Sequence, residues 1–356
     1  MNIQLQIRPY SLPMKSPWPG RLRNAFGQRK GWILALRAGD LRGWGDCAPL
    51  PAMGTESHED AGTFLVNTRA HHAPRISGML EDLAAARNTH PAASHALETA
   101  LLDVLARQQG IPLRQRLTNQ AVDRICVNAM AGDVCFQGNQ DANKQGCQVI
   151  KLKMGQHPIE EEIDCLHKLC ENLPPGIRLR LDANGAWPYE TTEKLLRSLE
   201  GLPVESLEEP LACPDLDDLD RLQEQTDIPL ALDESLKYLS FDEVLDSRLP
   251  RLVIKPALQG GLERGYRMAA MAAGRGKACV VTSLVESAVG IHAAAQLAAA
   301  VDSLSPGLAH GLATSAWLQK DVARPPRVEA GFMHLSNSPG LGIHEVFSSQ
   351  VHSPFS

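Results

Sequence analysis

The chain has 356 residues, of which 44% are hydrophobic and 21% charged, and its 35 basic against 41 acidic side chains give a formal net charge of −6. The hydrophobic share excludes a wholly disordered chain, and mild acidity without a dense Lys/Arg tract argues against a nucleic-acid or anionic-membrane partner. No run reaches about 18 apolar residues, so no membrane span is expected. The first residues lack a secretory-signal pattern, and we expect a cytoplasmic location.

The cysteines and histidines show no metal-binding spacing. The eight cysteines are dispersed and form no CxxC pair, and the histidines form no HExxH motif. In a chain of this size without an export signal, such cysteines are expected to be reduced thiols, neither a disulfide framework nor a zinc site. The cysteines are Cys47, Cys126, Cys135, Cys147, Cys165, Cys170, Cys213 and Cys279.

The N-terminal part of the chain predicts a small α+β module. Residues 2–7, 32–37 and 41–47 are β-prone, and the third run stops at the prolines and glycine of APLPAMG. A Pro/Gly/Arg-rich segment, residues 13–30, separates the first two runs. It is long for a structureless connection, and long connections of this kind often form lids over sites.

Helices follow these strands. In residues 93–108 the apolar side chains recur at 3.6-residue spacing, which predicts a helix with one buried stripe. Gly110 and Pro112 then end that helix. We therefore place the boundary of the first domain, residues 1–118, shortly after it.

The next part of the chain has a different sequence pattern, in which short apolar runs alternate with amphipathic helical segments. Strands that alternate with crossover helices predict an α/β fold with a parallel sheet, and about eight units indicate a closed barrel. No GxGxxG follows the first run, which argues against a Rossmann sheet. The predicted strands are residues 124–130, 148–154, 177–183, 204–210, 228–234, 251–256, 278–283 and 303–310.

Most of these runs end in a charged or polar side chain. From Lys153 onward, the charged ends follow one another at intervals of 29, 26, 25 and 22 residues, roughly one βα unit each. Such residues are expected at successive strand C-termini, where barrel enzymes have their active sites. They are Lys151, Lys153, Asp182, Glu208, Asp233, Lys255, Thr282 and Ser283.

Three of these ends, Asp182, Glu208 and Asp233, are carboxylates on adjacent strands. Like charges that converge in this way repel one another unless a cation neutralises them. Oxygen ligands without His or Cys suit a hard ion, so the pattern predicts Mg²⁺, with Mn²⁺ as a substitute. A bound dication would also lower the pKa of a nearby lysine such as Lys153, so that its amine could act as a base. Taken alone, Asp182 would more simply cap the following helix.

Five spaced motifs resemble the enolase superfamily, specifically the branch with lysines on both faces of the site. They are the KxK of VIKLKMG, the DAN of LRLDANGAW, the EEP of SLEEPL, the DES of LALDES and the IKP of VIKPALQGG. The resemblance implies a (β/α)7β-type barrel over residues 119–325 with the N-terminal module as a capping domain. It also implies that the C-terminal segment, residues 326–356, returns to that domain through SPGLGI.

The resemblance also implies roles for individual residues. Asp182, Glu208 and Asp233 would bind the metal, and Lys153 would be the acid/base on one face, with Lys255 on the other. Lys151 would be an electrostatic partner of Lys153, and Asn184 and Glu234 would support the ligands from behind.

Within the superfamily, TSLVESAVG (residues 282–290), HGLAT (residues 310–314) and IKPALQGG are similar to the o-succinylbenzoate synthase family. That family carries out a Mg-dependent syn dehydration of 2-succinyl-6-hydroxy-2,4-cyclohexadiene-1-carboxylate in menaquinone biosynthesis, through α-proton abstraction and an enediolate. Many synthases have Asp where this chain has Ala313, and the Asp-x-Asp clamp of dipeptide racemases is missing. The open alternatives are an N-acylamino acid racemase, a muconate-type cycloisomerase and a non-catalytic barrel that binds an anion or a partner.

The expected partner is a small-molecule carboxylate, and the sequence predicts no oligomeric state. Gly260 and Gly261 could hold an anion through their N–H groups or form a plain turn. Arg180 could order the carboxylate site or form a buried ion pair. Weaker candidates for the substrate pocket, besides Arg180, are Ser283, Glu286, Ser287, Gly311 and Leu312.

Overall fold

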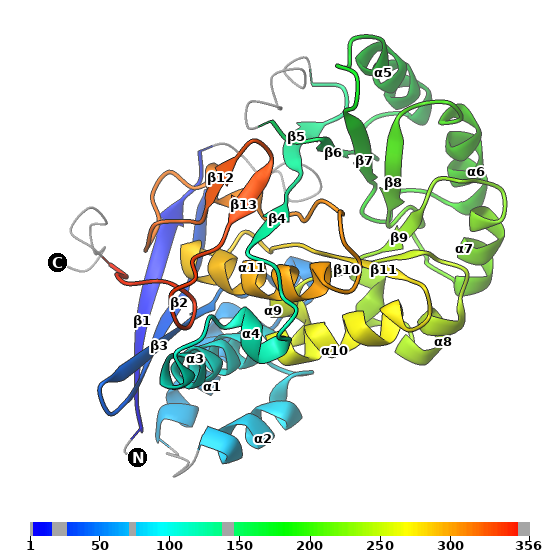
Figure 1. Cartoon of the computed structure of the whole chain (residues 1–356). Helices are drawn as coiled ribbons and strands as arrows, with labels where there is room; N and C mark the ends of the chain where they lie inside the picture. The colour runs from blue at the N-terminus through cyan, green and yellow to red at the C-terminus, as the bar shows by residue number, and fades with distance from the viewer. Residues whose placement is uncertain (1–2, 16–26, 71–75, 137–145, 348–356) are drawn as a thin grey trace.

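The computed structural model describes residues 3–15, 27–70, 76–136 and 146–347 and comprises an antiparallel module joined to a parallel α/β domain (Figure 1). In the first module, β1 (Ile3–Pro13), β2 (Gln28–Ala38) and β3 (Leu41–Cys47) form an antiparallel meander. The short η2 (Pro51–Met53) follows it. The proposed lid, residues 13–30, lies largely outside the described residues, because residues 16–26 are not described.

Helices cover one face of the meander. They are α1 (His58–Ala70), α2 (Ile76–Ala86) and α3 (Pro91–Gln109), and the one-turn α4 (Arg114–Leu117) follows. The helix predicted at residues 93–108 is therefore confirmed, and it ends at Gly110 in the left-handed conformation with φ of 70°. The two glycines of β3 allow α3 to approach closely, because a Cβ on Gly45 would lie 2.0 Å from the carbonyl oxygen of Ala96.

The parallel domain is a seven-stranded sheet whose strands follow one another in chain order. Helices alternate with the strands along most of the chain and lie on the outside (Figure 1). The strands are β5 (Ala129–Asp133), β6 (Val149–Lys153), β7 (Arg178–Asp182), β8 (Val204–Glu208), β9 (Leu230–Leu232), β10 (Arg251–Ile254) and β11 (Ala278–Val281). The helices are α5 (Ile159–Glu171), α6 (Tyr189–Ser198), α7 (Leu216–Gln223), α8 (Phe241–Asp246), α9 (Pro256–Gln259), α10 (Leu262–Ala273) and α11 (Ala288–Asp302).

Two of the eight predicted strands differ from the structure. The run at residues 124–130 is divided between β4 (Arg124–Cys126) and β5, and the run at residues 303–310 is not a strand. Instead, His310 forms a bridge to Val127 and Gly311 a bridge to Thr282. These parallel bridges connect the two edges of the sheet, so a closing segment of two residues takes the place of an eighth strand. Ser305, Pro306 and Gly307 precede it, which is a turn composition and explains why no longer strand forms.

The C-terminal segment contacts both parts of the molecule. β12 (Arg327–Glu329) and β13 (Phe332–His334) form a hairpin that pairs with β4. Gly340 then pairs with Pro112, and the N–H of Leu341 donates to the Asp103 carboxylate of α3.

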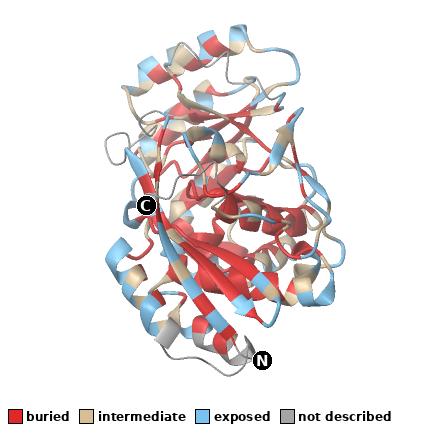
Figure 2. Cartoon of the chain, turned by 90° about the vertical axis from the view of Figure 1, so that its left-hand side faces the viewer, coloured by how far each residue is buried: buried red, intermediate tan, exposed pale blue. Residues whose placement is uncertain are grey.

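Burial follows the alternation of the strands. Leu179 and Leu181 share one face of β7, and Arg180 and Asp182, which are equally buried, share the other face. Figure 2 shows buried residues concentrated on the strands of both sheets and on the faces of helices that cover them. Within the described ranges, no helix is both long and apolar enough to cross a membrane.

One sequence expectation about cysteine is wrong. Cys135 and Cys165 are joined by a disulfide, with their Cα atoms 5.2 Å apart. The other six cysteines are free. The pairing follows from the fold, which brings a turn after β5 against α5 across 30 residues of sequence, and spacing along the chain does not reveal it.

Candidate active site

A cavity of about 450 Å³ lies where the strands of the parallel sheet end. Asp182, Asp233 and the three lysines predicted for the site line it, and Met53 of the antiparallel module contributes to the wall. Tyr238 and Trp317 also line the cavity, and the sequence analysis did not select either of them. Tyr238 directly follows the 3-10 helix Glu234–Lys237, and Trp317 ends the 3-10 helix Ala313–Trp317, so strand-end spacing could not reveal them.

The register of the sheet aligns the charged strand ends. Lys153 is paired with Asp182 across β6 and β7, and Asp182 with Glu208 across β7 and β8. Ala231 of β9 is opposite Glu208, so Asp233, two residues later, has the same orientation. Carboxylate oxygens of Asp182, Glu208 and Asp233 all lie within 4.8 Å of one another, and the three residues are buried.

The three lysines contact this carboxylate trio from two sides. Lys151 Nζ lies 2.7 Å from Asp182 Oδ2 and also donates to Glu208. Lys153 Nζ lies 2.7 Å from the same Asp182 oxygen, on the β6 side. Lys255, directly after β10, donates to Asp233 Oδ2 at 2.6 Å. Since β6 and β10 flank the three strands that carry the trio, Lys153 and Lys255 lie on opposite sides of it.

The electrostatics of the site follow from burial and these ion pairs. Burial lowers the pKa of Lys151, but the charges of Asp182 and Glu208 outweigh it and raise that pKa above its usual range. Asp233 raises the pKa of Lys255 in the same way against burial. Burial opposes ionisation of Asp182, yet Lys151 and Lys153 together hold the pKa of its carboxyl below its ordinary value. Burial alone would favour the neutral forms of Lys151, Lys255 and Asp182, but their ion pairs favour the charged forms.

The carboxylate trio suits a hard divalent cation. Glu208 Oε1 is buried and accepts no hydrogen bond from any described residue, and its nearest described cation, Arg180 Nε, is 3.6 Å away. Buried acceptors without donors are costly, and a cation satisfies them. The donor set contains only carboxylate oxygens, which favours Mg²⁺ or Mn²⁺ over zinc.

Asn184 and Glu234 connect the two lysine sides. Asn184 accepts a hydrogen bond from Lys153 Nζ at 2.7 Å and donates to Glu234 Oε1 at 2.8 Å. Glu234 Oε1 in turn lies 3.9 Å from Lys255 Nζ. Both residues therefore lie beside the trio and link Lys153 to Lys255.

Glu209 is a further residue of the site that the sequence analysis did not name. Its Oε2 accepts from the backbone N–H of Asp233 at 2.8 Å and from Ser235 Oγ at 2.9 Å. Burial raises the pKa of Glu209 to about 7. The sequence carried one signal for Glu209, because it is the second Glu of the EEP motif. A carboxylate buried beside a strand that carries a metal ligand must accept hydrogen bonds from nearby donors.

The weaker pocket candidates divide into two groups. Ser283 and Gly311 line the cavity, and Ser283 Oγ is 2.6 Å from Thr314 Oγ1. Glu286, Ser287 and Leu312 are buried and are not among the residues that line it.

The polar groups of these buried candidates bond elsewhere. Ser287 donates through both its N–H and its hydroxyl to Asp46 of β3, and Glu286 accepts from the N–H of Leu284. The Ser287 bonds connect the loop after β11 to the antiparallel module, and the Glu286 bond lies within that loop.

Arg180, Gly260 and Gly261 also have protein partners. Arg180 is fully buried and donates from Nε to Glu205 at 3.0 Å and from Nη1 to the carbonyl of Ala309 at 2.8 Å. It lies in the barrel interior beneath the trio, 3.6 Å from Glu208. Gly260 and Gly261 adopt positive φ angles, as a turn requires.

The N–H groups that follow these glycines already have an anionic partner. The Glu98 carboxylate accepts hydrogen bonds from the backbone N–H groups of Leu262 and Glu263 and forms an ion pair with Arg87. The anionic group beside this turn is therefore the Glu98 side chain of α3, which accepts from Leu262 and Glu263 and from neither glycine in the hydrogen bonds described.

The chain belongs to the enolase superfamily. The family model for the enolase C-terminal domain-like fold matches residues 137–345, and the model described as MenC, N-terminal domain, matches residues 3–103. The fold is accordingly that of an enolase-superfamily enzyme, with an N-terminal capping domain and a parallel-strand barrel domain.

Curated relatives and solved structures cover nearly the whole chain. The L-Ala-D/L-Glu epimerase of Bacillus subtilis is 27% identical over 96% of each chain, and the o-succinylbenzoate synthase of Salmonella dublin is 28% identical over 90% of this chain and 93% of its own. The solved B. subtilis epimerase superposes with a TM-score of 0.88 at 25% identity and covers 97% of this chain and 99% of its own. A dipeptide epimerase from Methylococcus capsulatus, solved with Mg and a dipeptide, gives 0.86 at 26% identity, over 96% and 99% of the two chains.

Proposed function

We propose that the protein is an o-succinylbenzoate synthase, which dehydrates 2-succinyl-6-hydroxy-2,4-cyclohexadiene-1-carboxylate in menaquinone biosynthesis. The observation that carries the proposal is the pair of lysines, Lys153 and Lys255, on opposite sides of a buried carboxylate trio in one cavity. The match of residues 3–103 to the MenC N-terminal domain supports this activity within the superfamily.

The metal site in this proposal consists of Asp182, Glu208 and Asp233. Bound there, Mg²⁺ would supply a Lewis acid that stabilises negative charge on the substrate's carboxylate. Asn184 and Glu234 would orient the adjacent side chains through the hydrogen bonds described above.

Lys153 is the proposed acid and base. In its neutral form, the amine removes the proton from the ring carbon that bears the carboxylate, and the electron pair moves into the carboxylate as an enediolate. The pair then returns to form a ring double bond, and the C–O bond to the neighbouring hydroxyl breaks. The Lys153 ammonium gives its proton to the departing oxygen, so water leaves and the ring becomes aromatic.

Lys255 is proposed to remain protonated on the opposite side of the substrate. Its ammonium, held against Asp233 at 2.6 Å, would stabilise the enediolate electrostatically. Lys151, which contacts both Asp182 and Glu208, would balance the charge of the trio beside Lys153. No oxidant or further co-reactant is needed, because one C–H and one C–O bond break and one water forms.

A racemase or epimerase is the second candidate. Lysines on both sides of one α-carbon could remove a proton from one face and return it to the other, and the relatives at similar identity include an epimerase. The loop at residues 308–315 lacks the acidic clamp of dipeptide racemases, however, and Gly311 and Thr314 line the cavity in its place. We therefore favour the dehydration.

The two activities are separated by a substrate comparison. The Mg²⁺-loaded protein is incubated with the cyclohexadiene substrate, with N-succinyl amino acids in deuterated water, with L-Ala-L-Glu and with muconate lactone. We expect kcat/KM for the dehydration to exceed that for deuterium incorporation by at least about 100-fold. Faster deuterium incorporation into an N-succinyl amino acid or a dipeptide would instead assign a racemase or epimerase.

A further inference from the structure

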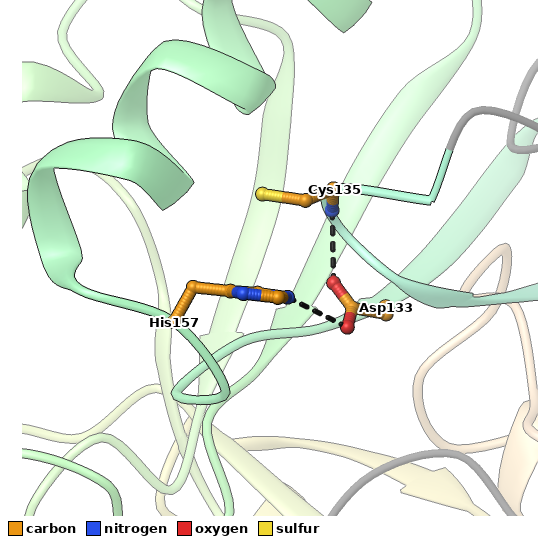
Figure 3. A group of neighbouring side chains, drawn as sticks. All are labelled: Asp133, Cys135 and His157. Atoms are coloured by element: carbon orange, nitrogen blue, oxygen red, sulfur yellow. Dashed lines mark hydrogen bonds and ion pairs between the residues drawn. The ribbon is translucent and has the colours of Figure 1, made fainter.

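A second group of metal-ligand side chains lies beside the active site, at the ends of β5 and β6. Asp133 is the last residue of β5, Cys135 follows two residues later, and His157 belongs to the turn between β6 and α5. Cys165 on α5 is bonded to Cys135. Figure 3 shows Asp133, Cys135 and His157 gathered from these separate segments.

The distances within this group approach those of a zinc site. Ligand atoms of Asp133, Cys135 and His157 all lie within 4.8 Å of one another, and His157 Nε2 is 2.9 Å from Asp133 Oδ2. Tetrahedral zinc, with bonds of about 2.0 to 2.3 Å, holds its ligand atoms about 3.3 to 3.8 Å apart. Since Cys165 is bonded to Cys135, opening the disulfide would make a second thiol available beside this group as a fourth ligand.

The turn that carries His157 is held in place independently of the group. The buried Glu162 accepts hydrogen bonds from the backbone N–H groups of Gly155, Gln156 and His157. The side chains of His157 and Asp133 remain 32% and 21% exposed, so an ion can reach them from solvent. The ring is therefore positioned before any metal binds, which lowers the entropic cost of ligation.

We propose that, in the reduced protein, Asp133, Cys135, His157 and Cys165 form a zinc site, and that the disulfide and the zinc-bound state exclude each other. Two thiolates, one imidazole and one carboxylate are a ligand set that zinc accepts. When a small-molecule disulfide such as glutathione disulfide oxidises the pair, the two cysteine sulfurs lose two electrons and bond to each other. The oxidant's S–S bond accepts these two electrons and breaks into two thiolates, which take protons from water, and zinc leaves.

The proposed zinc site connects β5, β6 and α5 next to the cavity. Asp133 is paired with Lys153 across β5 and β6, and the N–H of Val134 donates to the Lys153 carbonyl at 3.0 Å. Either zinc or the disulfide would thus tie α5 to the strand end that carries Lys153. The inference rests on this geometry alone and holds whichever reaction the cavity carries out.

The test uses Co²⁺ as a spectroscopic probe for zinc in the full-length protein, reduced with a phosphine and kept in excess Mg²⁺ to occupy the carboxylate trio. We expect one equivalent of Co²⁺ to give a thiolate charge-transfer band and the intense visible bands of tetrahedral cobalt, which added Zn²⁺ abolishes. Protein oxidised with glutathione disulfide should give neither band. Reduced wild-type protein with only the weak bands of octahedral cobalt would overturn the proposal.

Variants assign the ligands. Cys135→Ser and Cys165→Ser should each lose the intense cobalt spectrum, and His157→Gln should weaken Co²⁺ binding by at least about tenfold. Cys213→Ser, at an exposed free cysteine, is the matched control and should keep the spectrum. An unchanged spectrum in Cys165→Ser would contradict the site. Circular dichroism checks folding, and the oxidised-against-reduced comparison needs no substitution.

Discussion

Lys153 is the residue that acts as acid and base in the proposed reaction. Its Nζ lines the cavity and contacts only side chains of the site, Asp182 and Asn184. Loss of a positioned general base costs about 10² to 10⁴ in rate. We therefore expect Lys153→Ala to lower kcat by about 10³ while circular dichroism stays unchanged.

The control for this substitution is Lys194→Ala, because Lys194 is exposed and pairs only with Glu160 among the contacts described. Its kcat should equal that of the wild type. Full activity of Lys153→Ala would assign the base to another group.

Asp233 is expected to be a metal ligand, because its buried carboxylate lies within 4.8 Å of those of Asp182 and Glu208. Asp233→Asn removes one negative charge from the trio, and we expect Mg²⁺ affinity, measured by calorimetric titration, to fall at least about tenfold. Asp227→Asn, at an exposed position, should bind Mg²⁺ as the wild type does. Equal affinities in the two variants would refute the ligand role.

At the scale of single elements, the segment that closes the sheet depends on one neutral histidine. His310 is buried, and its Nδ1 accepts the backbone N–H of Val281 at 2.9 Å. Burial, with a smaller contribution from Arg180, lowers the pKa of His310 to about 3. The unfolded chain, with a histidine pKa of about 6.5, therefore binds a proton that the folded protein does not bind between these values.

This difference in proton binding lowers the stability of the folded protein in acid. Since the unfolded state binds more protons, the free energy of unfolding should fall by up to about 1.4 kcal/mol per pH unit below pH 6.5. In His310→Asn the amide oxygen can accept the same N–H without titrating, and we expect it to lose about 1.6 kcal/mol less than the wild type between pH 6.5 and 5. Urea unfolding of both proteins at the two pH values measures the change in the free energy of unfolding. Equal changes in the wild type and His310→Asn would contradict the role of His310.

The contact between β3 and α3 depends on glycine. A Cβ at Gly45 would lie 2.0 Å from the Ala96 carbonyl, which is backbone and cannot rotate away. We expect Gly45→Ala to lower the free energy of unfolding by about 2 to 3 kcal/mol. Gly27→Ala, where a Cβ would meet nothing within 4 Å, should change it by less than about 0.5 kcal/mol. Similar free energies of unfolding of the two variants in urea would contradict the close contact between Gly45 and Ala96.

At the scale of the whole molecule, the features that could be predicted from the sequence are those that depend on the spacing of the strands. Strands that repeat every 22 to 29 residues determine which charged ends meet, so Lys153, Asp182, Glu208 and Lys255 could be placed near one another from the sequence. The strand predicted from a single local pattern at residues 303–310 did not form. The closing segment at His310 is two bridged residues instead of a strand, because its pairing is imposed by both sheet edges.

Contacts between distant segments were not visible in the sequence. The disulfide between Cys135 and Cys165 requires β5 and α5 to meet, and Ser287 binds Asp46 only because the capping domain lies against the loop after β11. Met53, Tyr238 and Trp317 line the cavity from loops. Loop conformations follow from packing that no periodicity records, so substrate-contacting residues were the least predictable part of the site.

Anomalous diffraction from crystals soaked with Mn²⁺ and o-succinylbenzoate tests the arrangement of ion, ligands and bases in one experiment. The account predicts one manganese peak bonded to oxygens of Asp182, Glu208 and Asp233, with the product carboxylate beside it. It also predicts the Nζ atoms of Lys153 and Lys255 on opposite faces of the product ring. A peak elsewhere, or both amines on the same face, would contradict it.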